Sequence, residues 1–494
     1  MRKIISIDQS TQSTKAFLFS SDGKILSSSS RVHEQYYPAP GFVEHNPMDL
    51  YLNTLAVIKE LLEGDKDSNA EYSLAITNQR ETVVVWNKIS GEPISNAVVW
   101  QDVRGKDLCK ELIDKGCEKL VNSITGLCLD PYFSASGAAW LLNNIPNARE
   151  LAQRGDLLMG TVDSWLIWKL TKGEVHATDY TNASRTLLFD IHKMEWSNEM
   201  LELFNIPASM MPKALPCDAK FGETDLEGYL SNKIEIAGVI GDSHGALVGQ
   251  MCFTEGLAKA TFGTGSSVMV NIGEKYSDAP AGLVTSIAYA ANGKVFYGFE
   301  GNIHCTGMTI TWLEKELGLI SHVNEVESLA QSVPSSEGVY LVPAFAGLGA
   351  PWWRNDVRAM ICGLTLGSGK AHICRAALES IAYQITDLVE AMTKSAGISL
   401  KELRVDGGPT KNRFLMQLQS NLLRVPITRS EVMDASAFGA FVVNSFAFKE
   451  STTFEQATSF ANFDIPIVPN KDYMEIESDY NGWKEAIALL TKKN

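Results

Sequence analysis

The sequence predicts an α/β protein built from two domains with related cores. At 494 residues the chain is longer than a single hydrophobic core usually serves. The same order of elements, a hairpin with a polar turn, then further strands, then helices, occurs twice along it. Asp8 and Asp242 follow apolar strands at related places in this order. We place the domain boundary near Gly249, so that the domains are residues 1–248 and 249–494.

The first half is expected to open with three antiparallel strands. Strands are predicted at 3–8, 15–20 and 25–28, because Asp22-Gly23 between two apolar runs is typical of a hairpin. Apolar periodicity predicts a helix over 49–63. Further strands are expected at 73–77, 82–86 and 97–100, and further helices at 104–115, 136–144 and 164–170.

The second half is expected to repeat this order. The strand 236–240 leads into a turn at Asp242, and 256–272 should form a hairpin bent at Gly263-Thr264-Gly265. The remaining predicted elements are strands at 294–300, 339–343 and 404–406, a long helix over 371–395 and a helix that begins near 411. The glycine-rich segment 347–351 is equally compatible with a mobile loop and a rigid turn.

Composition narrows the class of protein. A hydrophobic content of 45% with 20% charged residues is ordinary for a globular protein. The formal net charge of −15 argues against a nucleic-acid partner, because such binding needs a basic surface. No run approaches a membrane span, and the N-terminus lacks the apolar stretch of a signal peptide. We therefore expect a cytoplasmic protein whose eight cysteines are reduced and have no metal or redox role.

Asp242 is the strongest candidate for a catalytic group. It stands between an apolar strand and the small residues that open a helix, so its carboxylate is exposed yet rigidly held, as a general base for a small hydroxylated substrate should be. Asp8 precedes a loop, residues 10–15, whose amides, hydroxyls and one cation could hold a phosphate. Two such aspartates suggest phosphoryl transfer between two lobes. On these residues alone, a helix N-cap at Asp242 and a solvated loop at 10–15 stay open.

Ten motifs make the chain resemble a known family. They are DQSTQSTK, ITNQRET, VVWQ, DPYFS, GTVDSWLIWKLT, TDYTNASRT, GDSHGAL, FGTGS, AFAGLGAPWW and RVDGGPTKN, in the order found in the FGGY carbohydrate kinases, among which the glycerol kinases are most similar. The resemblance extends from Ile4 to about Trp483. It implies two lobes of the ribonuclease H/actin-like ATPase fold with a duplicated core. It also implies ATP and Mg²⁺ as cofactors, and phosphorylation of a primary hydroxyl of a small polyol or sugar in the cleft between the lobes.

The resemblance assigns residues to the nucleotide. The family positions for nucleotide binding are Thr11, Gln12, Ser13, Lys15, Thr264, Gly307, Thr311, Gly408 and Asn412. Three positions depart from the family. Ser10 replaces a Gly, which restricts the backbone. Lys15 replaces an Arg, so a single ammonium charge stands where the family has a planar guanidinium with several donors. Thr311 replaces a Gln, which puts the contact of that side chain with the nucleotide in doubt.

The resemblance also assigns the acceptor pocket. Its family positions are Arg80, Glu81, Trp100, Tyr132, Asp242 and Ser243. Asp242 would take the proton from the attacking hydroxyl, and Asp8 would help it to hold Mg²⁺, partly through water. Arg80 and Glu81 are interpreted as a buried charge pair, which is costly unless it serves a ligand; a purely structural pair is the alternative.

Two pocket positions are smaller than the family pattern. Ser243 replaces a Gln that normally binds a terminal hydroxyl, and Ser267 replaces a Phe that packs against the acceptor carbons. A pocket widened at one end should admit a longer acceptor, and it should bind a small one less well where a hydrogen bond is lost. We therefore expect a four- to five-carbon polyol or ketose, with glycerol still possible.

Two other classes of function stay open. One is a catalytically inactive sugar sensor on the same scaffold, against which Asp8, Asp242 and the two phosphate loops argue. The other is an actin-like ATPase that works on a protein partner, which the match of Arg80, Glu81 and Tyr132 to a small-polyol site disfavours. Family members are often dimers or tetramers, so a homo-oligomer is expected.

Overall fold

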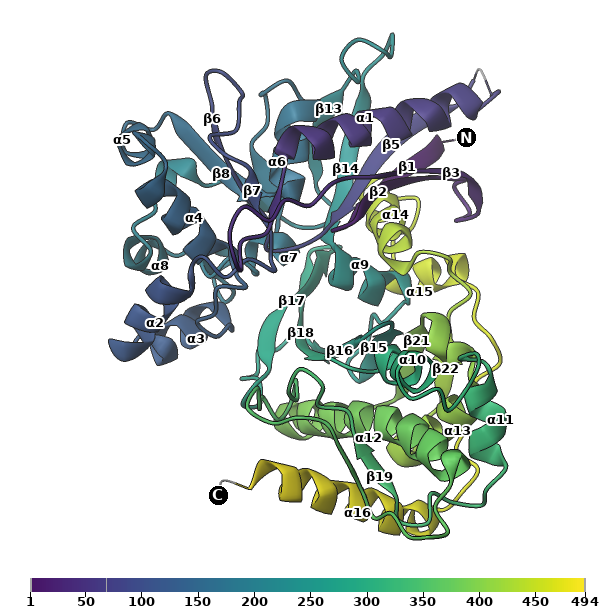
Figure 1. The fold of residues 1–494 in the computed structure, drawn as a ribbon. Helices are drawn as coiled ribbons and strands as arrows, with labels where there is room; N and C mark the ends of the chain where they lie inside the picture. Colours follow the sequence, from purple (N-terminus) through teal and green to yellow (C-terminus); the bar gives the residue numbers. More distant parts are fainter. Residues whose placement is uncertain (1, 68, 493–494) are drawn as a thin grey trace.

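The computed structural model describes residues 2–67 and 69–492. Two six-stranded mixed sheets dominate it, one in each half of the chain, and they meet near β17, β18 and α9 (Figure 1). The first sheet has the order β13-β14-β5-β1-β2-β3. Its strands are β1 (Arg2–Gln9), β2 (Ser13–Phe19), β3 (Ile25–Val32), β5 (Glu71–Asn78), β13 (Lys220–Thr224) and β14 (Ile234–Gly241).

The second sheet has the order β17-β18-β16-β15-β21-β22. Its strands are β15 (Leu257–Phe262), β16 (Ser266–Gly273), β17 (Val284–Ala291), β18 (Lys294–Ile303), β21 (Glu402–Asp406) and β22 (Ile427–Arg429). In each sheet three antiparallel strands are followed by two parallel ones: β3-β2-β1-β5-β14 corresponds to β18-β16-β15-β21-β22. The predicted duplication of the core is confirmed.

Helices cover both faces of each sheet. Because side chains alternate along a strand, Ile5 and Ile7 of β1 face α1 (Pro47–Gly64) and α6 (Val162–Leu170), while Ile4 faces α14 (Ala435–Ala447). The second sheet packs against α12 (Lys370–Ala396) on one face and α9 (Asp242–Gly249) on the other. The other helices of the second half are α10 (Gly307–Lys315), α11 (Glu325–Gln331), α13 (Arg413–Leu423), α15 (Phe454–Ala457) and α16 (Tyr473–Thr491).

An additional layer is inserted in the first half. A four-stranded sheet, β4-β7-β6-β8, packs with short helices around a core of its own. Its members are β4 (Glu44–His45), β6 (Val83–Asn87), β7 (Ala97–Val98), β8 (Leu157–Thr161), α2 (Lys106–Asp114), α3 (Glu118–Thr125), α4 (Ser134–Asn144), α5 (Ala148–Gln153) and α8 (Asn198–Leu203). The helix α7 (Tyr180–Ala183) and three two-stranded sheets complete the fold: β9 (Ala177–Asp179) with β12 (Lys213–Leu215), β10 (Phe189–Asp190) with β11 (Glu195–Trp196), and β19 (Tyr340–Val342) with β20 (Met360–Cys362).

Most predicted elements occur within two residues of the expected bounds. The strand expected at 97–100 ends earlier, at Val98, and leaves Trp100 beyond it. The strands expected at 82–86 and 97–100 belong to the inserted sheet, where β6 pairs with β7 and β8. The sequence did not predict this, because a local pattern of residues does not specify which strands pair. The sequence interpretation missed β17, although Asn292-Gly293 between it and β18 is a strong hairpin pattern, and both residues have positive φ.

The helix α14 lies in the second half of the sequence but packs on the first sheet. Ser6 Oγ donates to the Ala437 carbonyl oxygen at 2.6 Å, and Asn444 Nδ2 donates to the Ala237 carbonyl oxygen at 2.7 Å. Phe19 contacts the rings of Phe438 and Phe441. The domain limits 1–248 and 249–494 stay a prediction, and the chain crosses back to the first sheet at this helix.

Glycines allow α9 and α14 to cross in close contact. A Cβ at Gly439 would lie 1.9 Å from the Gly245 carbonyl oxygen, and one at Gly249 would lie 2.0 Å from the Ala435 carbonyl oxygen. No side chain fits between the two backbones. Because Asp242 begins α9, this crossing also holds the predicted catalytic carboxylate in place.

Replacing Gly439 with Ala is expected to destabilise the protein by about 1–3 kcal/mol, the usual cost of overpacking a core. Thermal unfolding followed by circular dichroism measures the effect as a lower midpoint. The control is Gly64→Ala at the end of α1, where a Cβ meets no atom within 4 Å. Equal midpoints for the two variants would contradict the close crossing.

Candidate active site

The predicted acidic residues meet at one edge of the first sheet. β1, β5 and β14 are parallel, so their carboxyl ends lie together. In the register, Asp8 is opposite Thr77, and Asn78 is opposite both Gln9 and Gly241. Arg80 and Glu81 follow β5, and Asp242 follows β14. Asp242 is the first residue of α9, whose N-cap is Gly241, so the simple N-cap role does not apply.

Asp8 lies in a small cluster of carboxylates with one lysine. Lys15 Nζ is 2.9 Å from Asp434 Oδ2 and 3.6 Å from Asp8 Oδ2. Burial and the negative charges of Asp434 and Asp242 raise the pKa of Asp8 well above its ordinary value, against the opposing effect of Lys15. The sequence interpretation missed Asp434, because it lies on the loop before α14, distant in sequence from Asp8. Among the described residues, no group of three or more His, Cys, Asp or Glu side chains is arranged as a complete metal site.

The charge pairing around Arg80 differs from the prediction. Arg80 and Glu81 are both buried, but they do not form an ion pair with each other. Arg80 Nη1 and Nη2 donate to the two oxygens of Glu300 at 2.9 and 2.8 Å, and Nε lies 3.0 Å from Asp242 Oδ1. Glu81 Oε1 accepts from Arg185 Nε at 2.6 Å instead. The expected Arg80–Glu81 pair was therefore wrong, because adjacent side chains at this turn point to different partners.

Glu300 and Arg185 complete this network. Arg185 Nη1 lies 3.0 Å from Glu300 Oε2, so one carboxylate serves two guanidinium groups. Burial would raise the pKa of Glu300, but Arg80 and Arg185 lower it, and Glu300 stays ionised. Burial raises the pKa of Glu81 against the lowering effect of Arg80 and Arg185. A charged residue inside an apolar strand, as in Val295–Gly301 around Glu300, is the sequence pattern that could have found it.

Glu81 is held in an unusual backbone conformation. Its φ is +62°, a left-handed value that a glutamate adopts rarely. Ser134 Oγ donates to its carbonyl oxygen at 2.7 Å, and the salt bridge to Arg185 fixes its side chain. The surrounding contacts therefore stabilise a conformation that the local sequence does not favour.

Trp100 and Tyr132 form an aromatic wall. Their ring centroids are 5.6 Å apart, and Trp100 Nε1 donates to Thr11 Oγ1 at 2.9 Å. Burial raises the pKa of Tyr132, so its hydroxyl stays protonated. The wall thus joins the predicted acceptor residues to the predicted phosphate loop at Thr11. Gln12 and Ser13 belong to the same loop, which Ser10 closes by donating to the Ser13 carbonyl oxygen at 2.9 Å.

The two positions expected to widen the pocket both carry hydrogen-bonded hydroxyls. Ser243 Oγ accepts from Arg80 Nη2 at 3.2 Å, and Ser267 Oγ accepts from Lys259 Nζ at 3.1 Å. Lys259, which sequence reasoning missed, is only 1% exposed, and burial lowers its pKa. In the second sheet, Lys259 of β15 is paired with Met269 of β16, and Met269 is paired in turn with Glu300 of β18. These side chains therefore lie on the sheet face that packs against α9.

The remaining predicted nucleotide residues line one cavity of about 690 Å³ in the second half. Thr264, Gly307, Thr311, Gly408 and Asn412 all contribute to it, together with apolar residues such as Ile310 and Leu378. Thr311 Oγ1 donates to the Gly307 carbonyl oxygen at 3.3 Å, within its own helix. A mostly apolar space with a few polar groups suits a flat heteroaromatic base.

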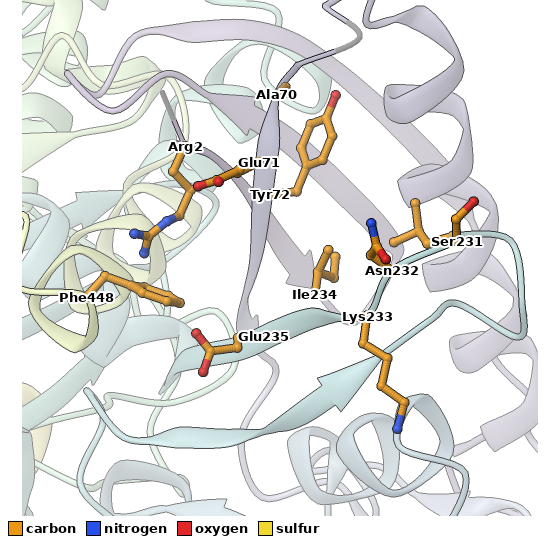
Figure 2. Close-up of a pocket in the computed structure, with 11 residues that line it drawn as sticks. Arg2, Ala70, Glu71, Tyr72, Ser231, Asn232, Lys233, Ile234, Glu235 and Phe448 are labelled. Carbon is orange, nitrogen blue, oxygen red and sulfur yellow. The ribbon is translucent and has the colours of Figure 1, made fainter.

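A second cavity, of about 480 Å³, lies at the opposite end of the first sheet (Figure 2). It is lined by the first residues of three strands, Arg2, Glu71 and Ile234, and by Ser231–Lys233. The Arg2 guanidinium lies over the Phe448 ring, and the Lys233 side chain points out of the cavity (Figure 2). Lys233 Nζ lies 3.8 Å from Glu174 Oε2. The cavity is therefore remote from Asp8 and Asp242.

The glycine-rich segment 347–351 is tied to its surroundings by backbone hydrogen bonds. Leu348 and Arg354 bond to each other in both directions at 3.0 Å, and the Ala350 amide donates to the Asn302 carbonyl oxygen at 3.1 Å. Within the described ranges, the helices are all too short or too polar to cross a membrane.

Comparisons with known proteins agree with this geometry. Residues 3–249 match the N-terminal domain of the FGGY family of carbohydrate kinases, and residues 258–448 match its C-terminal domain. Glycerol kinase 1 of Thermotoga maritima is 47% identical over 489 residues, 99% of each chain. Glycerol kinase of Bacillus cytotoxicus is 44% identical over 98% of each chain.

Solved structures show the same fold. Plasmodium falciparum glycerol kinase with ADP aligns with a TM-score of 0.96 at 36% identity, covering 100% of this chain and 99% of its own. A ligand-bound xylulose kinase of Lactobacillus acidophilus aligns with a TM-score of 0.91 at 20% identity, which bears on the fold alone. The protein is a two-lobed kinase with the actin-like ATPase architecture. It belongs to the FGGY family of carbohydrate kinases, ATP-dependent phosphotransferases that use Mg²⁺.

Replacing Arg185 with Met is expected to lower the free energy of unfolding by about 3–5 kcal/mol, because Glu81 loses its buried partner. The loss should be smaller at pH 5 than at pH 8. The pKa of Glu81 is already raised, and it rises further without Arg185, so protonation at low pH relieves the unpaired charge.

Urea unfolding at the two pH values measures this loss. The matched control is Arg154→Met, whose ion pair with Asp156 lies at the surface and should contribute about 0–1 kcal/mol. A loss at Arg185 no greater than that of the control would show that the network has little effect on stability.

Proposed function

We propose that the protein transfers the γ-phosphoryl group of ATP to a primary hydroxyl of glycerol. The observation that carries this proposal is the arrangement of Arg80 with its Nε 3.0 Å from Asp242 Oδ1, beside the Trp100–Tyr132 wall. A carboxylate for the proton, a guanidinium for a hydroxyl oxygen and an aromatic wall for the carbon chain suit a small polyol. The names of relatives at 44–47% identity over nearly the whole chain support glycerol.

Asp242 is proposed as the general base. The acceptor hydroxyl oxygen forms a bond to the γ-phosphorus, its proton goes to Asp242, and the bond to the ADP oxygen breaks. Arg80 Nε lies 3.0 Å from Asp242 Oδ1, but its N–H is not directed at an acceptor in hydrogen-bond geometry among the described residues, so it can donate to an acceptor hydroxyl. Glu81 can accept a hydrogen bond from a second hydroxyl, and Trp100 and Tyr132 can exclude water from the carbon chain.

The nucleotide is proposed to span both halves. Its phosphates would contact Thr11, Gln12, Ser13 and Lys15 from the first half and Thr264 from the second. Its base and ribose would enter the 690 Å³ cavity beside Gly307, Thr311, Gly408 and Asn412.

Asp8 and Asp242 are the proposed Mg²⁺ residues. Burial, together with the carboxylates of Asp434 and Asp242, raises the pKa of Asp8, and a bound cation would oppose these effects by stabilising the ionised carboxylate. Their carboxylate oxygens suit Mg²⁺, which commonly uses one or two carboxylates together with phosphates and water. When bound, Mg²⁺ neutralises charge on the transferring phosphoryl group.

A four- to five-carbon polyol or ketose is the second candidate acceptor. Ser243 and Ser267 favour it, since both are short and offer hydroxyls where longer acceptors have additional oxygens. The relatives named glycerol kinase do not support that preference. The inactive-sensor and partner-driven ATPase alternatives are disfavoured, because Asp8, Asp242 and the acceptor residues are all present. Assembly into a homo-oligomer and a cytoplasmic location stay predictions.

Glycerol should be the preferred acceptor when ADP release is measured with Mg-ATP across glycerol, erythritol, threitol, erythrulose, xylulose and ribulose. The control Asp242→Asn should lower kcat by about 100- to 10,000-fold, the usual contribution of a general base. It should leave the affinity for ADP measured without Mg²⁺ unchanged, because Asp242 does not line the base cavity.

Three results would overturn parts of this assignment. A longer acceptor with kcat/KM at least about tenfold above glycerol, or about 1.4 kcal/mol in transition-state binding, would establish the widened pocket. Full activity of Asp242→Asn would remove Asp242 as the base. ADP release that no acceptor stimulates would favour the ATPase or sensor alternatives over the kinase assignment.

Gly408→Leu is expected to weaken ADP binding at least about tenfold, by filling a cavity that is already sized for one ligand. A Cβ at Gly408 meets no protein atom within 4 Å, so the side chain should enter the open cavity without disturbing the fold. Isothermal titration with ADP measures the change. Gly369→Leu, also at a position open to 4 Å but outside the cavity lining, is the control. Unchanged ADP affinity in Gly408→Leu would place the nucleotide elsewhere.

A further inference from the structure

The acceptor pocket is completed by a side chain from the other sheet. Arg80 follows β5 of the first sheet, whereas Glu300 lies on β18 of the second. Their contact is a two-pronged salt bridge, with Arg80 Nη1 2.9 Å from Glu300 Oε2 and Nη2 2.8 Å from Oε1. Arg80 is 5% exposed and Glu300 2%. Bidentate pairs of this kind fix the plane of the guanidinium as well as its position.

Neighbouring contacts hold β17 and β18 against the first half of the chain. The Thr285 amide donates to the Gly126 carbonyl oxygen at 3.0 Å, and Tyr297 Oη donates to the Ile191 carbonyl oxygen at 2.9 Å. Glu300 therefore approaches Arg80 from a strand that is held against the first half of the chain close to Glu300, by Tyr297 on β18 and by Thr285, which is opposite Phe299. Glu300 of the second sheet therefore holds both terminal nitrogens of Arg80, while Ser243 and Asp242 at the start of α9 provide its other polar contacts.

Glu300 also determines the charge next to Asp242. The fully buried groups Arg80, Arg185, Glu81 and Glu300 carry two positive and two negative charges, which cancel. Asp242, which is 35% exposed, lies at the edge of this neutral group, and Lys259 is a further buried cation whose charge acts on both Glu300 and Asp242. Without the Glu300 carboxylate, this group would carry a net positive charge, and the nearest carboxylate to Arg80 would be Asp242.

The geometry points to Glu300 as a positioning residue for phosphoryl transfer. It holds the Arg80 guanidinium so that Nε faces the acceptor site, and it prevents Arg80 from forming a full salt bridge with Asp242. Asp242 then keeps a carboxylate oxygen free to take the proton of the acceptor hydroxyl. This inference rests on the proposed function of the same pocket, and it assigns to the second sheet a part in binding the acceptor as well as the nucleotide.

The test compares Glu300→Gln with wild type in steady-state kinetics on glycerol and ATP. Gln keeps the size of the side chain but removes its charge. We expect kcat/KM for glycerol to fall about 100-fold, the scale of a lost base or a lost positioning contact, while KM for ATP changes by less than about threefold. Hydrolysis of ATP in the absence of an acceptor should persist, because a water molecule that attacks the γ-phosphate does not have to be positioned by Arg80. The control is Glu223→Gln, an exposed residue of β13 that should behave as wild type.

A double-mutant cycle with Arg80→Lys tests whether Glu300 acts through Arg80. In the Arg80→Lys background, Glu300→Gln should lower kcat/KM for glycerol by less than about threefold, because contacting residues are not additive. Equal losses in both backgrounds would overturn the inference. So would a uniform fall in glycerol turnover, ATP hydrolysis and ADP binding, which indicates a purely structural role.

If the Glu300→Gln variant does not fold, the Glu300→Asp variant is used in the same kinetic comparison. It keeps the charge but retracts the carboxylate by one methylene, so a loss of kcat/KM for glycerol is again expected, and wild-type kinetics would overturn the inference. The wild-type protein separates this test from the proposed function. If wild type phosphorylates another acceptor in place of glycerol, the substrate assignment fails, and the same comparison is made with that acceptor.

Discussion

The bidentate salt bridge between Arg80 and Glu300 is the contact on which the acceptor pocket depends. Buried charges are costly, and removal of one partner leaves the other uncompensated. The structure meets this cost by collecting Arg80, Arg185, Glu81 and Glu300 into one neutral group. Each member has at least one partner, and only Asp242 at the edge of the group is partly exposed. The proposed acceptor pocket is therefore bounded by paired, buried charges, and the carboxylate proposed to take the proton is partly open to solvent.

This arrangement requires the two sheets to be held together. α14 returns from the second half of the sequence to pack on the first sheet, and glycines let it cross α9 at backbone contact distance. α9 begins with Asp242 and packs against the second sheet on the face that carries Lys259 and Glu300. The carboxylate proposed as the general base thus lies on an element in contact with both sheets, which suits chemistry that must occur between a bound nucleotide and a bound acceptor.

The sequence predicted the secondary-structure elements better than it predicted which charged side chains pair with each other. The hairpin β1-β2-β3 was predictable because Asp22-Gly23 is a local turn pattern, and α12 because its apolar periodicity extends over many turns. The loop of Thr11 and the cavity residues Gly307 and Gly408 were found through family motifs. Arg185, Lys259, Glu300 and Asp434 were missed. Arg185 lies in the motif TDYTNASRT, but that motif does not reveal its pairing with Glu81, and the other three stand in none of the ten motifs. The partners of Arg185, Glu300 and Asp434 are 104, 220 and 419 residues away in sequence. Lys259 bonds Ser267 only eight residues away, but its burial depends on the fold.

By itself the sequence determined the family, the duplicated α/β core and the positions of Asp8 and Asp242 at the ends of strands. These follow from motif order, apolar periodicity and local turn chemistry, which a linear chain displays directly. The tertiary structure alone decided that Glu81 pairs with Arg185, that Arg80 pairs with Glu300 across two sheets, and that Lys259 bonds Ser267 in the interior. Ion pairing depends on distance and burial in space, and no local pattern in the chain encodes those quantities.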